Sequence, residues 1–212
     1  MNDNRLHLPR VFRRQLLPCV VIKALSLVKI RIWPFLVFQE HVDTIVQIPF
    51  EQSVEDLEVV VLREEQLSGM PPRPGKGNTP ENLQRRMDDG NLCVAALVNG
   101  TIVAYCWASF EMMDFKAYKV ALEECEAYLS DAYTVPQFRG KNLAGHLRCR
   151  LYRELEQRGR ERFFSITLCC NKPALRLTQK LQSRVVDSGT VLSVAGWSIA
   201  TRPCLQRGRR EP

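Results

Sequence analysis

The chain has 212 residues, of which 45% are hydrophobic and 25% are charged, which are proportions of an ordinary globular protein with one sizeable domain. Its net charge of +7 comes from the ends, because residues 1–31 carry +6 and residues 202–212 carry +3, while the 170 residues between them are slightly acidic. This distribution argues against nucleic-acid binding.

The eight cysteines and three histidines have no metal-ligand spacing. No CxxC pair occurs, and the histidines share no spacing with the cysteines, so we predict no metal site. Cys93, Cys106 and Cys169 lie inside apolar runs, where a cysteine outside a disulfide packs as a small hydrophobe. Because such cysteines suit a reducing compartment, we predict a cytoplasmic protein.

The N-terminal segment is basic and partly apolar. Lys23, Lys29 and Arg31 interrupt its apolar runs, which argues against a membrane-spanning helix and a cleavable signal peptide. We predict an appendage at residues 1–50, a folded domain at 51–203 and a basic tail at 204–212. Residues 1–31 could contact a membrane surface or an acidic partner, and the sequence leaves the oligomeric state open.

The first elements of the domain are short. The β-branched run at 57–62 predicts a buried strand, and residues 68–80, rich in proline and glycine, predict a mobile loop. A short helix is expected at 80–89, ending at a glycine. Residues 91–110 contain two apolar strands around Asn99-Gly100, a dipeptide typical of a tight hairpin turn.

The second half alternates strands and helices. We expect a strand at about 127–135, followed by an amphipathic helix with a leucine at every fourth position, namely Leu143, Leu147, Leu151 and Leu155. A strand at 162–170, a helix at 172–182 and closing strands at 190–200 complete the pattern. The order predicts a mixed α/β fold.

The stretch "TVPQFRGKNLAGHL" at 134–147 joins the predicted strand to the amphipathic helix. A helix start presents unpaired backbone N–H groups and partial positive charge. Gly140 allows close approach of a ligand, and Arg139 and Lys141 add full charges. These features predict a site for a phosphate group.

Two segments carry a resemblance to a known family. "YTVPQFRGKNLAGHL" and, about thirty residues later, "ITLCCNKPALRLTQKLQ" resemble the acyl-CoA-binding motifs of the GNAT superfamily of N-acetyltransferases. The resemblance covers roughly residues 57–200. It implies an α/β fold with a mixed, mostly antiparallel central sheet, splayed at strands four and five and flanked by helices.

The resemblance also implies where acetyl-CoA, the acyl donor, would bind. Backbone N–H groups would hold its pyrophosphate, the end of the preceding strand would pair with its pantetheine arm, and an asparagine would contact the pantetheine amide. In this sequence the cofactor-binding residues would be Arg139, Gly140, Lys141, Asn142, Leu143 and Ala144 for the pyrophosphate, Ala132, Tyr133 and Thr134 for the pantetheine, and Asn171 for its amide. No metal is needed.

The candidate catalytic residues follow the family pattern less closely than the cofactor-binding residues do. Asp131 and Glu126, on the strand that would line the site, are candidates for the base that deprotonates the amine. Thr178 stands where many family members have the tyrosine that protonates the leaving thiolate. Tyr128 and Tyr133 are alternatives for the acid. Asn142 stands where the family usually has glycine.

We therefore expect transfer of an acetyl group from acetyl-CoA to the primary amine of a small acceptor, by direct attack in a ternary complex. One alternative is a long-chain N-acyltransferase that uses an acyl-carrier protein. Another is a non-catalytic CoA-binding module, which the departures at Asn142 and Thr178 keep open.

Overall fold

The computed structural model describes residues 30–40, 54–73 and 78–201. They form two compact units. The larger unit contains the described residues of 41–113 and 121–165, and the smaller unit contains 30–40, 114–120 and 166–201. The predicted tail at 204–212 and most of the predicted appendage lie outside the described residues.

The larger unit is built on strands β2 (Leu57–Val61), β3 (Leu92–Val98), β4 (Thr101–Ser109), β7 (Glu126–Thr134) and the start of β8 (Arg162–Leu168), in that spatial order. Pairing is antiparallel from β2 to β7 and parallel between β7 and β8. Its helical elements are η2 (Glu64–Gly69), α3 (Pro80–Asp88), η3 (Pro136–Phe138) and α4 (Leu143–Glu156). A mostly antiparallel sheet flanked by helices confirms the predicted fold class.

The predicted hairpin is present between β3 and β4. Asn99 and Gly100 both have positive φ angles, of 49° and 72°. A type I′ turn needs positive φ at both central residues, and asparagine followed by glycine is the pair that adopts it most readily. Val98 therefore pairs with Thr101 across a two-residue turn.

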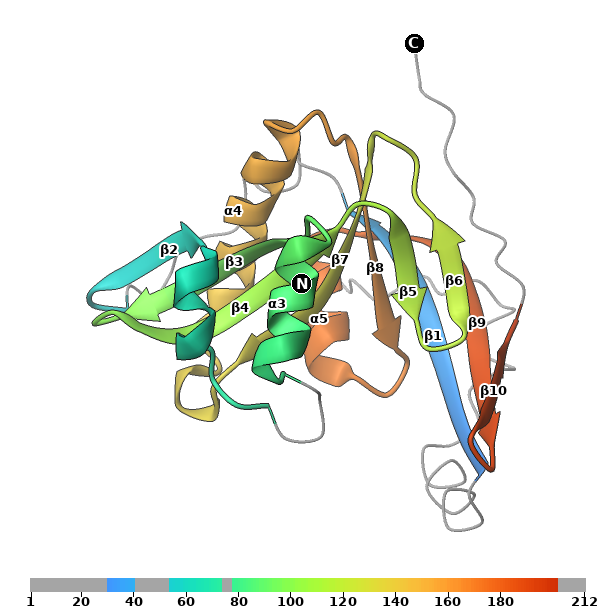
Figure 1. Cartoon of the computed structure of the whole chain (residues 1–212). Helices are drawn as coiled ribbons and strands as arrows, with labels where there is room; N and C mark the ends of the chain where they lie inside the picture. The colour runs from blue at the N-terminus through green and yellow to red at the C-terminus, as the bar shows by residue number, and fades with distance from the viewer. Residues whose placement is uncertain (1–29, 41–53, 74–77, 202–212) are drawn as a thin grey trace, which may run out of the picture. The chain divides into compact units, whose positions relative to one another are not determined.

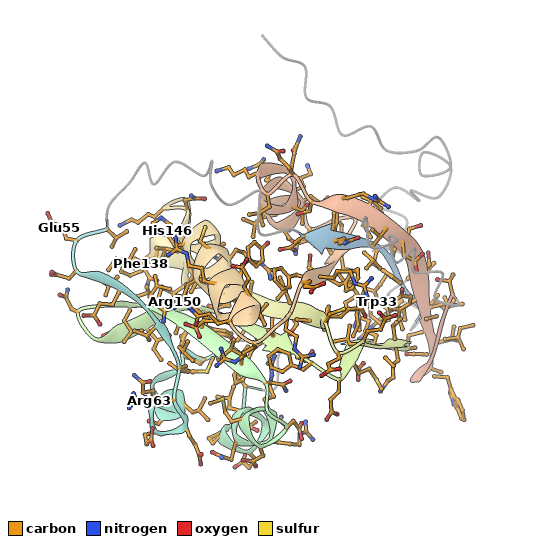
Figure 2. The ribbon with its side chains drawn as sticks, turned by 90° about the horizontal axis from the view of Figure 1, so that it is seen from above. Trp33, Glu55, Arg63, Phe138, His146 and Arg150 are labelled. Carbon is orange, nitrogen blue, oxygen red and sulfur yellow. The ribbon has the colours of Figure 1, made fainter. Side chains whose placement is uncertain are left out.

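Helices cover both faces of this sheet (Figure 1). Leu83 of α3 joins a buried cluster with Cys93, Ala95 and Leu97 of β3. Because successive strand residues face opposite sides, the residues of β3 that lie between these three face the side on which α4 packs. Seen from above, α4 lies on one side of the sheet while α3 and η2 lie on the other (Figure 2).

The buried thiol of Cys93 makes stability depend on pH. Burial, with the nearby Cys106 as a smaller cause, raises the pKa of Cys93 well above its usual value. When folding raises the pKa of a thiol, the stabilisation that this group contributes is fully present below its unfolded-state pKa. That contribution is lost as the pH rises toward the folded-state pKa.

We therefore expect the free energy of unfolding to fall above about pH 9. Urea unfolding across the alkaline range measures this fall. Cys93→Val keeps an apolar side chain of similar size, so its curve should be flatter than that of the wild type. Identical slopes for the two proteins would show that the Cys93 thiol does not contribute.

The smaller unit contains β1 (Ile30–Glu40), β9 (Arg184–Val194), β10 (Trp197–Ala200) and α5 (Lys172–Lys180). The strands β5 (Met112–Phe115) and β6 (Tyr118–Ala121) form a two-stranded sheet, and residues 114–120 of it belong to this unit. Phe35 of β1 packs edge-on against Phe115 and Tyr118, with ring centroids 5.5 and 4.8 Å apart.

The strand β1 lies within residues 1–50, which the sequence predicted as an appendage. It pairs antiparallel with β9, from Ile30 opposite Val194 to Gln39 opposite Arg184. The family resemblance covers only residues 57–200, and the basic residues around Ile30 obscured the apolar run that follows. A partner strand more than 140 residues away in the sequence leaves no local pattern.

Candidate acyl-CoA site

The turn before α4 contains two residues in the left-handed backbone conformation. Gly140 and Asn142 adopt positive φ angles of 83° and 55°, so the chain reverses sharply between η3 and α4. Asn142 is the N-cap residue of α4 and takes the left-handed conformation that asparagine tolerates better than most residues. Asn142, which stands where the resemblance leads one to expect glycine, thus adopts a backbone conformation that glycine also adopts readily.

The loop leaves room above Gly140. A Cβ atom built on this glycine would have no neighbouring heavy atom within 4 Å. Leu143 and Ala144 begin α4 just after it, at positions where backbone N–H groups have no partner within a helix, whereas the Gly145 N–H donates to the Asn142 carbonyl at 2.9 Å. Lys141 lies beside the Phe138 ring, with its Nζ 5.1 Å from the centroid. Phe138 and His146 lie near the same end of α4 (Figure 2).

Arg139 takes part in the turn in a different way from its neighbours. Its backbone N–H donates to the carbonyl of Pro136 at 3.2 Å, within the η3 turn. Its Nε donates to the carbonyl oxygen of Thr134 at 3.1 Å. The side chain of Arg139 thus ties the loop to the end of β7.

The strands β7 and β8 pair over only part of the length of β7. The parallel register runs from Glu126 opposite Arg162 to Leu129 opposite Ser165. On its other edge, β7 stays paired with β4 as far as Thr134. Ala132, Tyr133 and Thr134 therefore lie beyond the portion of β7 that pairs with β8.

The strand β7 has a β-bulge on its edge with β4, just beyond the last residue that pairs with β8. Trp107 is opposite Ser130 and Tyr105 is opposite Tyr133, so β7 has one residue more than β4 between these pairs. Asp131 accommodates the extra residue with a φ of 54°. Bulges turn side chains out of the regular alternation and often lie beside active sites.

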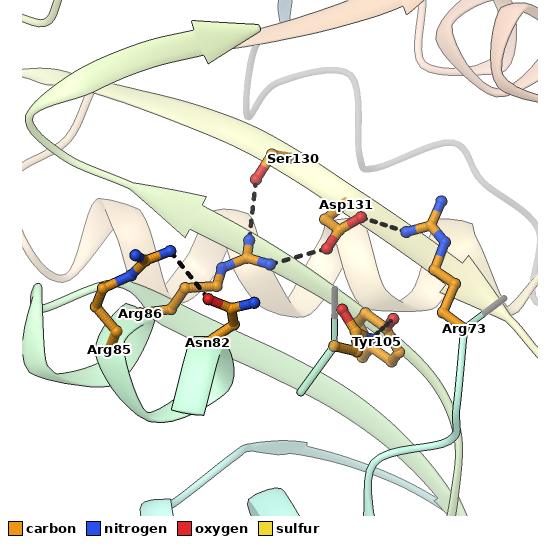
Figure 3. A network of polar contacts seen from close by, with 8 residues as sticks. Arg73, Asn82, Arg85, Arg86, Tyr105, Ser130 and Asp131 are labelled. Carbon is orange, nitrogen blue, oxygen red and sulfur yellow. Dashed lines mark hydrogen bonds and ion pairs between the residues drawn. The ribbon is translucent and has the colours of Figure 1, made fainter. Parts of the chain in front are cut away.

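The carboxylate of Asp131 contacts two arginines. Its Oδ2 lies 2.8 Å from Nη1 of Arg86, on α3, and its Oδ1 forms a second ion pair with Nη1 of Arg73 (Figure 3). Arg86 also donates to Ser130 Oγ at 3.4 Å. Asp131, a candidate base, therefore lies in a charged cluster next to the predicted pantetheine segment.

Aromatic side chains adjoin this cluster. The Tyr105 and Tyr133 rings lie 5.7 Å apart, and the guanidinium carbon of Arg86 lies 4.1 Å from the Trp107 ring centroid. Burial raises the pKa of Tyr105, whose hydroxyl oxygen accepts a hydrogen bond from Asn78 Nδ2 at 2.6 Å. Sequence reasoning missed Tyr105, Arg73 and Arg86, because nothing in their local sequence indicates that they meet.

Glu126, the other candidate base, has a different environment. Its side chain is fully buried, with Oε1 3.2 Å from Arg162 and Oε2 accepting from the Glu123 backbone N–H at 2.9 Å. It lies at the first residue of β7, whereas Asp131 lies five residues further along. These contacts tie β7 to β8 and to the preceding turn.

Asn171 and Thr178 belong to the smaller unit. Asn171 caps α5, where its side-chain oxygen accepts from the Ala174 N–H at 3.4 Å. Thr178 is buried in α5, and its hydroxyl donates to the Leu175 carbonyl at 3.0 Å. Both side chains thus have structural contacts within their own helix.

Residues 58–182 match the family model described as the acetyltransferase (GNAT) family. This match covers more than half of the chain and includes both motif segments. The chain belongs to the GNAT family.

Solved structures agree with this membership at the level of the fold. A Drosophila protein superposes with a TM-score of 0.57 at 15% identity, over 84% of this GNAT chain and 57% of its own. A GNAT-family protein from Novosphingobium aromaticivorans superposes with a TM-score of 0.51 at 19% identity, over 77% of this chain and 64% of its own. A tandem GNAT protein from the clavulanic acid biosynthesis pathway superposes with a TM-score of 0.56 at 13% identity, over 81% of this chain and 55% of its own.

This GNAT chain therefore spans less than two thirds of the length of these three structures. Comparison with curated protein sequences found none significantly similar to it. Among the described helices, none combines the length and apolar character that a membrane crossing requires. Within the described ranges, no three His, Cys, Asp or Glu side chains are grouped as metal ligands would be.

Proposed function

We propose that this GNAT protein is an N-acetyltransferase that transfers the acetyl group of acetyl-CoA to the primary amine of a small acceptor. The observation that carries the proposal is the turn at Gly140–Asn142, which leads into α4 and follows β7, the strand whose pairing with β8 ends at Leu129. The pyrophosphate would bind the N–H groups of this turn and of the α4 N-terminus.

The pantetheine arm would lie along β7 beyond Leu129, where pairing with β8 has ended. Backbone groups of Ala132, Tyr133 and Thr134 would then bond to the pantetheine as an added strand does. This placement brings the thioester close to the bulge at Asp131. A contact between Asn171, which caps α5, and the pantetheine amide stays a prediction from the family resemblance.

The reaction itself needs no covalent enzyme intermediate. The bound ammonium loses a proton, and its nitrogen attacks the acetyl carbonyl to form a new N–C bond. Backbone N–H groups stabilise the oxyanion, the C–S bond breaks, and one amine proton ends on the CoA thiol while the other passes to water. Most of the rate enhancement would come from holding the two substrates in register.

Asp131 is the candidate we favour for contact with the acceptor amine. It is next to the predicted thioester, whereas Glu126 is buried in a structural ion pair. Because Asp131 already contacts two guanidinium groups, we propose that it orients the ammonium and that the proton leaves through water. The role predicted for Thr178 gains no support from its hydrogen bond to the Leu175 carbonyl.

The second candidate is a non-catalytic CoA-binding module. The hydroxyl of Thr178 favours it, because this group donates a hydrogen bond to a carbonyl within α5 and Thr178 stands where many family members have the proton donor for the thiolate. The experiment that separates the two is calorimetric titration with acetyl-CoA followed by a thiol-release assay with a panel of primary amines. We expect micromolar binding and amine-dependent release of CoA. Binding without release for every amine would favour the module, and no binding by folded protein would reject both candidates.

We keep the cytoplasm as the proposed location. None of the six described cysteines forms a disulfide, and three of them, Cys93, Cys106 and Cys149, are buried. Such usage suits a reducing compartment. Contact of residues 1–31 with an acidic partner or a membrane surface stays a prediction from their charge.

A further inference from the structure

Three charged side chains meet beside the bulge in β7, and we call Arg73, Arg86 and Asp131 the arginine clamp. Arg73 precedes α3, Arg86 lies on α3, and Asp131 lies on β7 (Figure 3). Their side chains are 20%, 24% and 13% exposed, so the clamp is largely enclosed but still reached by solvent. A small solute could therefore contact it.

Each arginine of the clamp has both a polar contact and an aromatic contact. Arg86 is held between Asp131 Oδ2 at 2.8 Å, Ser130 Oγ at 3.4 Å and the face of Trp107. Arg73 is held by Asp131 Oδ1 and by the face of Tyr133, whose centroid lies 5.3 Å from its guanidinium carbon. A guanidinium stacked on an aromatic ring loses little further freedom when it binds a ligand.

The clamp carries a net charge of +1, because two guanidinium groups share one carboxylate. Each guanidinium has five N–H donors, and Asp131 and Ser130 use only some of them. Planar guanidinium groups bind a carboxylate through paired hydrogen bonds. An incoming carboxylate would therefore be attracted, whereas a compound with several ammonium groups would be repelled.

The single carboxylate of the clamp suits the other end of such a ligand. An ammonium group can form a charge-assisted hydrogen bond to Asp131, which is partly exposed. Asp131 is next to Ala132, where the predicted pantetheine segment begins. A ligand with its carboxylate on the arginines would thus place its amine beside the acetyl group.

We propose that the acceptor is an amino acid with a free carboxylate close to the reacting amine. This proposal rests on the acetyltransferase function proposed above. It excludes polyamines and aminoglycosides as preferred acceptors, because they carry several positive charges and no carboxylate. The carboxylate determines affinity through Arg73 and Arg86, and the clamp aligns the amine for attack on acetyl-CoA.

The test compares amines that differ only in their carboxylate. Glycine and L-phenylalanine are assayed against glycinamide and L-phenylalaninamide, with spermidine and kanamycin as polycations, by release of the CoA thiol. We expect kcat/KM for an amino acid to exceed that of its amide by at least about tenfold, since charge-assisted hydrogen bonds are lost in the amide.

Variants then locate the effect at the clamp. Arg86→Gln should raise KM for the amino acid by about 10- to 100-fold and leave KM for the amide nearly unchanged. Arg85→Gln is the matched control, because Arg85 is the neighbouring residue on α3 and donates to Asn82 Oδ1 outside the clamp. Arg86→Lys should recover part of the loss, and thermal melting of each variant verifies folding.

Binding of the amino acids to the acetyl-CoA complex, measured by calorimetry, decides the case if turnover is slow. Saturable binding of an amino acid but not of its amide supports the proposal. Equal binding of both, preference for spermidine or kanamycin, absence of amino-acid binding at millimolar concentration, or equal effects of Arg86→Gln and Arg85→Gln would overturn it. Failure of acetyl-CoA to bind would instead overturn the proposed function, and the two failures are therefore distinguishable.

Discussion

Gly140→Trp is expected to weaken acetyl-CoA binding by at least about 30-fold, which corresponds to about 2 kcal/mol. Gly140 has a φ of 83°, and no heavy atom lies within 4 Å of the position where a Cβ would be. The indole would therefore extend into the open space above the turn without displacing the protein core. That space is where the pyrophosphate is proposed to bind.

The matched control is Gly159→Trp. Gly159 follows the other end of α4, has a φ of 72° and likewise has no heavy atom within 4 Å of an added Cβ. Both variants thus carry the same backbone strain, about 1–2 kcal/mol, because L-residues disfavour positive φ. Calorimetric titration should show wild-type affinity for Gly159→Trp. Equal affinities of the two variants would contradict the proposed cofactor site.

Asp131→Asn is expected to lower kcat/KM for the acceptor by about 100-fold while acetyl-CoA affinity changes by no more than about twofold. The asparagine side chain has the same size as that of Asp131 but lacks the negative charge that pairs with Arg73 and Arg86. Without that charge, the acceptor ammonium loses its partner and the two guanidinium groups repel each other. Steady-state kinetics and calorimetry measure the two effects separately.

The same variant should also lose stability, by about 2 kcal/mol, which is below the range for fully buried pairs because the clamp is partly exposed. Asp114→Asn is the control, since Asp114 pairs with Lys119 at 3.0 Å and both side chains are more than half exposed. Surface pairs of that kind contribute little, so its melting temperature should stay close to that of the wild type. Wild-type kinetics and stability for Asp131→Asn would contradict the role given to Asp131.

Much of the fold could be predicted because its signals are local. Asn99-Gly100 specifies a turn through the φ angles of two adjacent residues, and the leucines of α4 specify a buried face through their four-residue spacing. Strand β1 was not predicted, because its partner β9 is distant in the sequence and the pairing leaves no local pattern. The short strands β5 and β6 were also missed, since four residues are too few to establish an alternation.

The sequence by itself determined the turn before α4 and the family to which the chain belongs. Gly140, Lys141 and Asn142 are contiguous, and backbone conformation at such a turn depends on the residues within it. Only the tertiary structure decided the arginine clamp, because Arg73 and Arg86 lie 58 and 45 residues from Asp131. The bulge that presents Asp131 arises from the pairing of β7 with β4, and Arg86 reaches Asp131 because α3 packs on that face of the sheet.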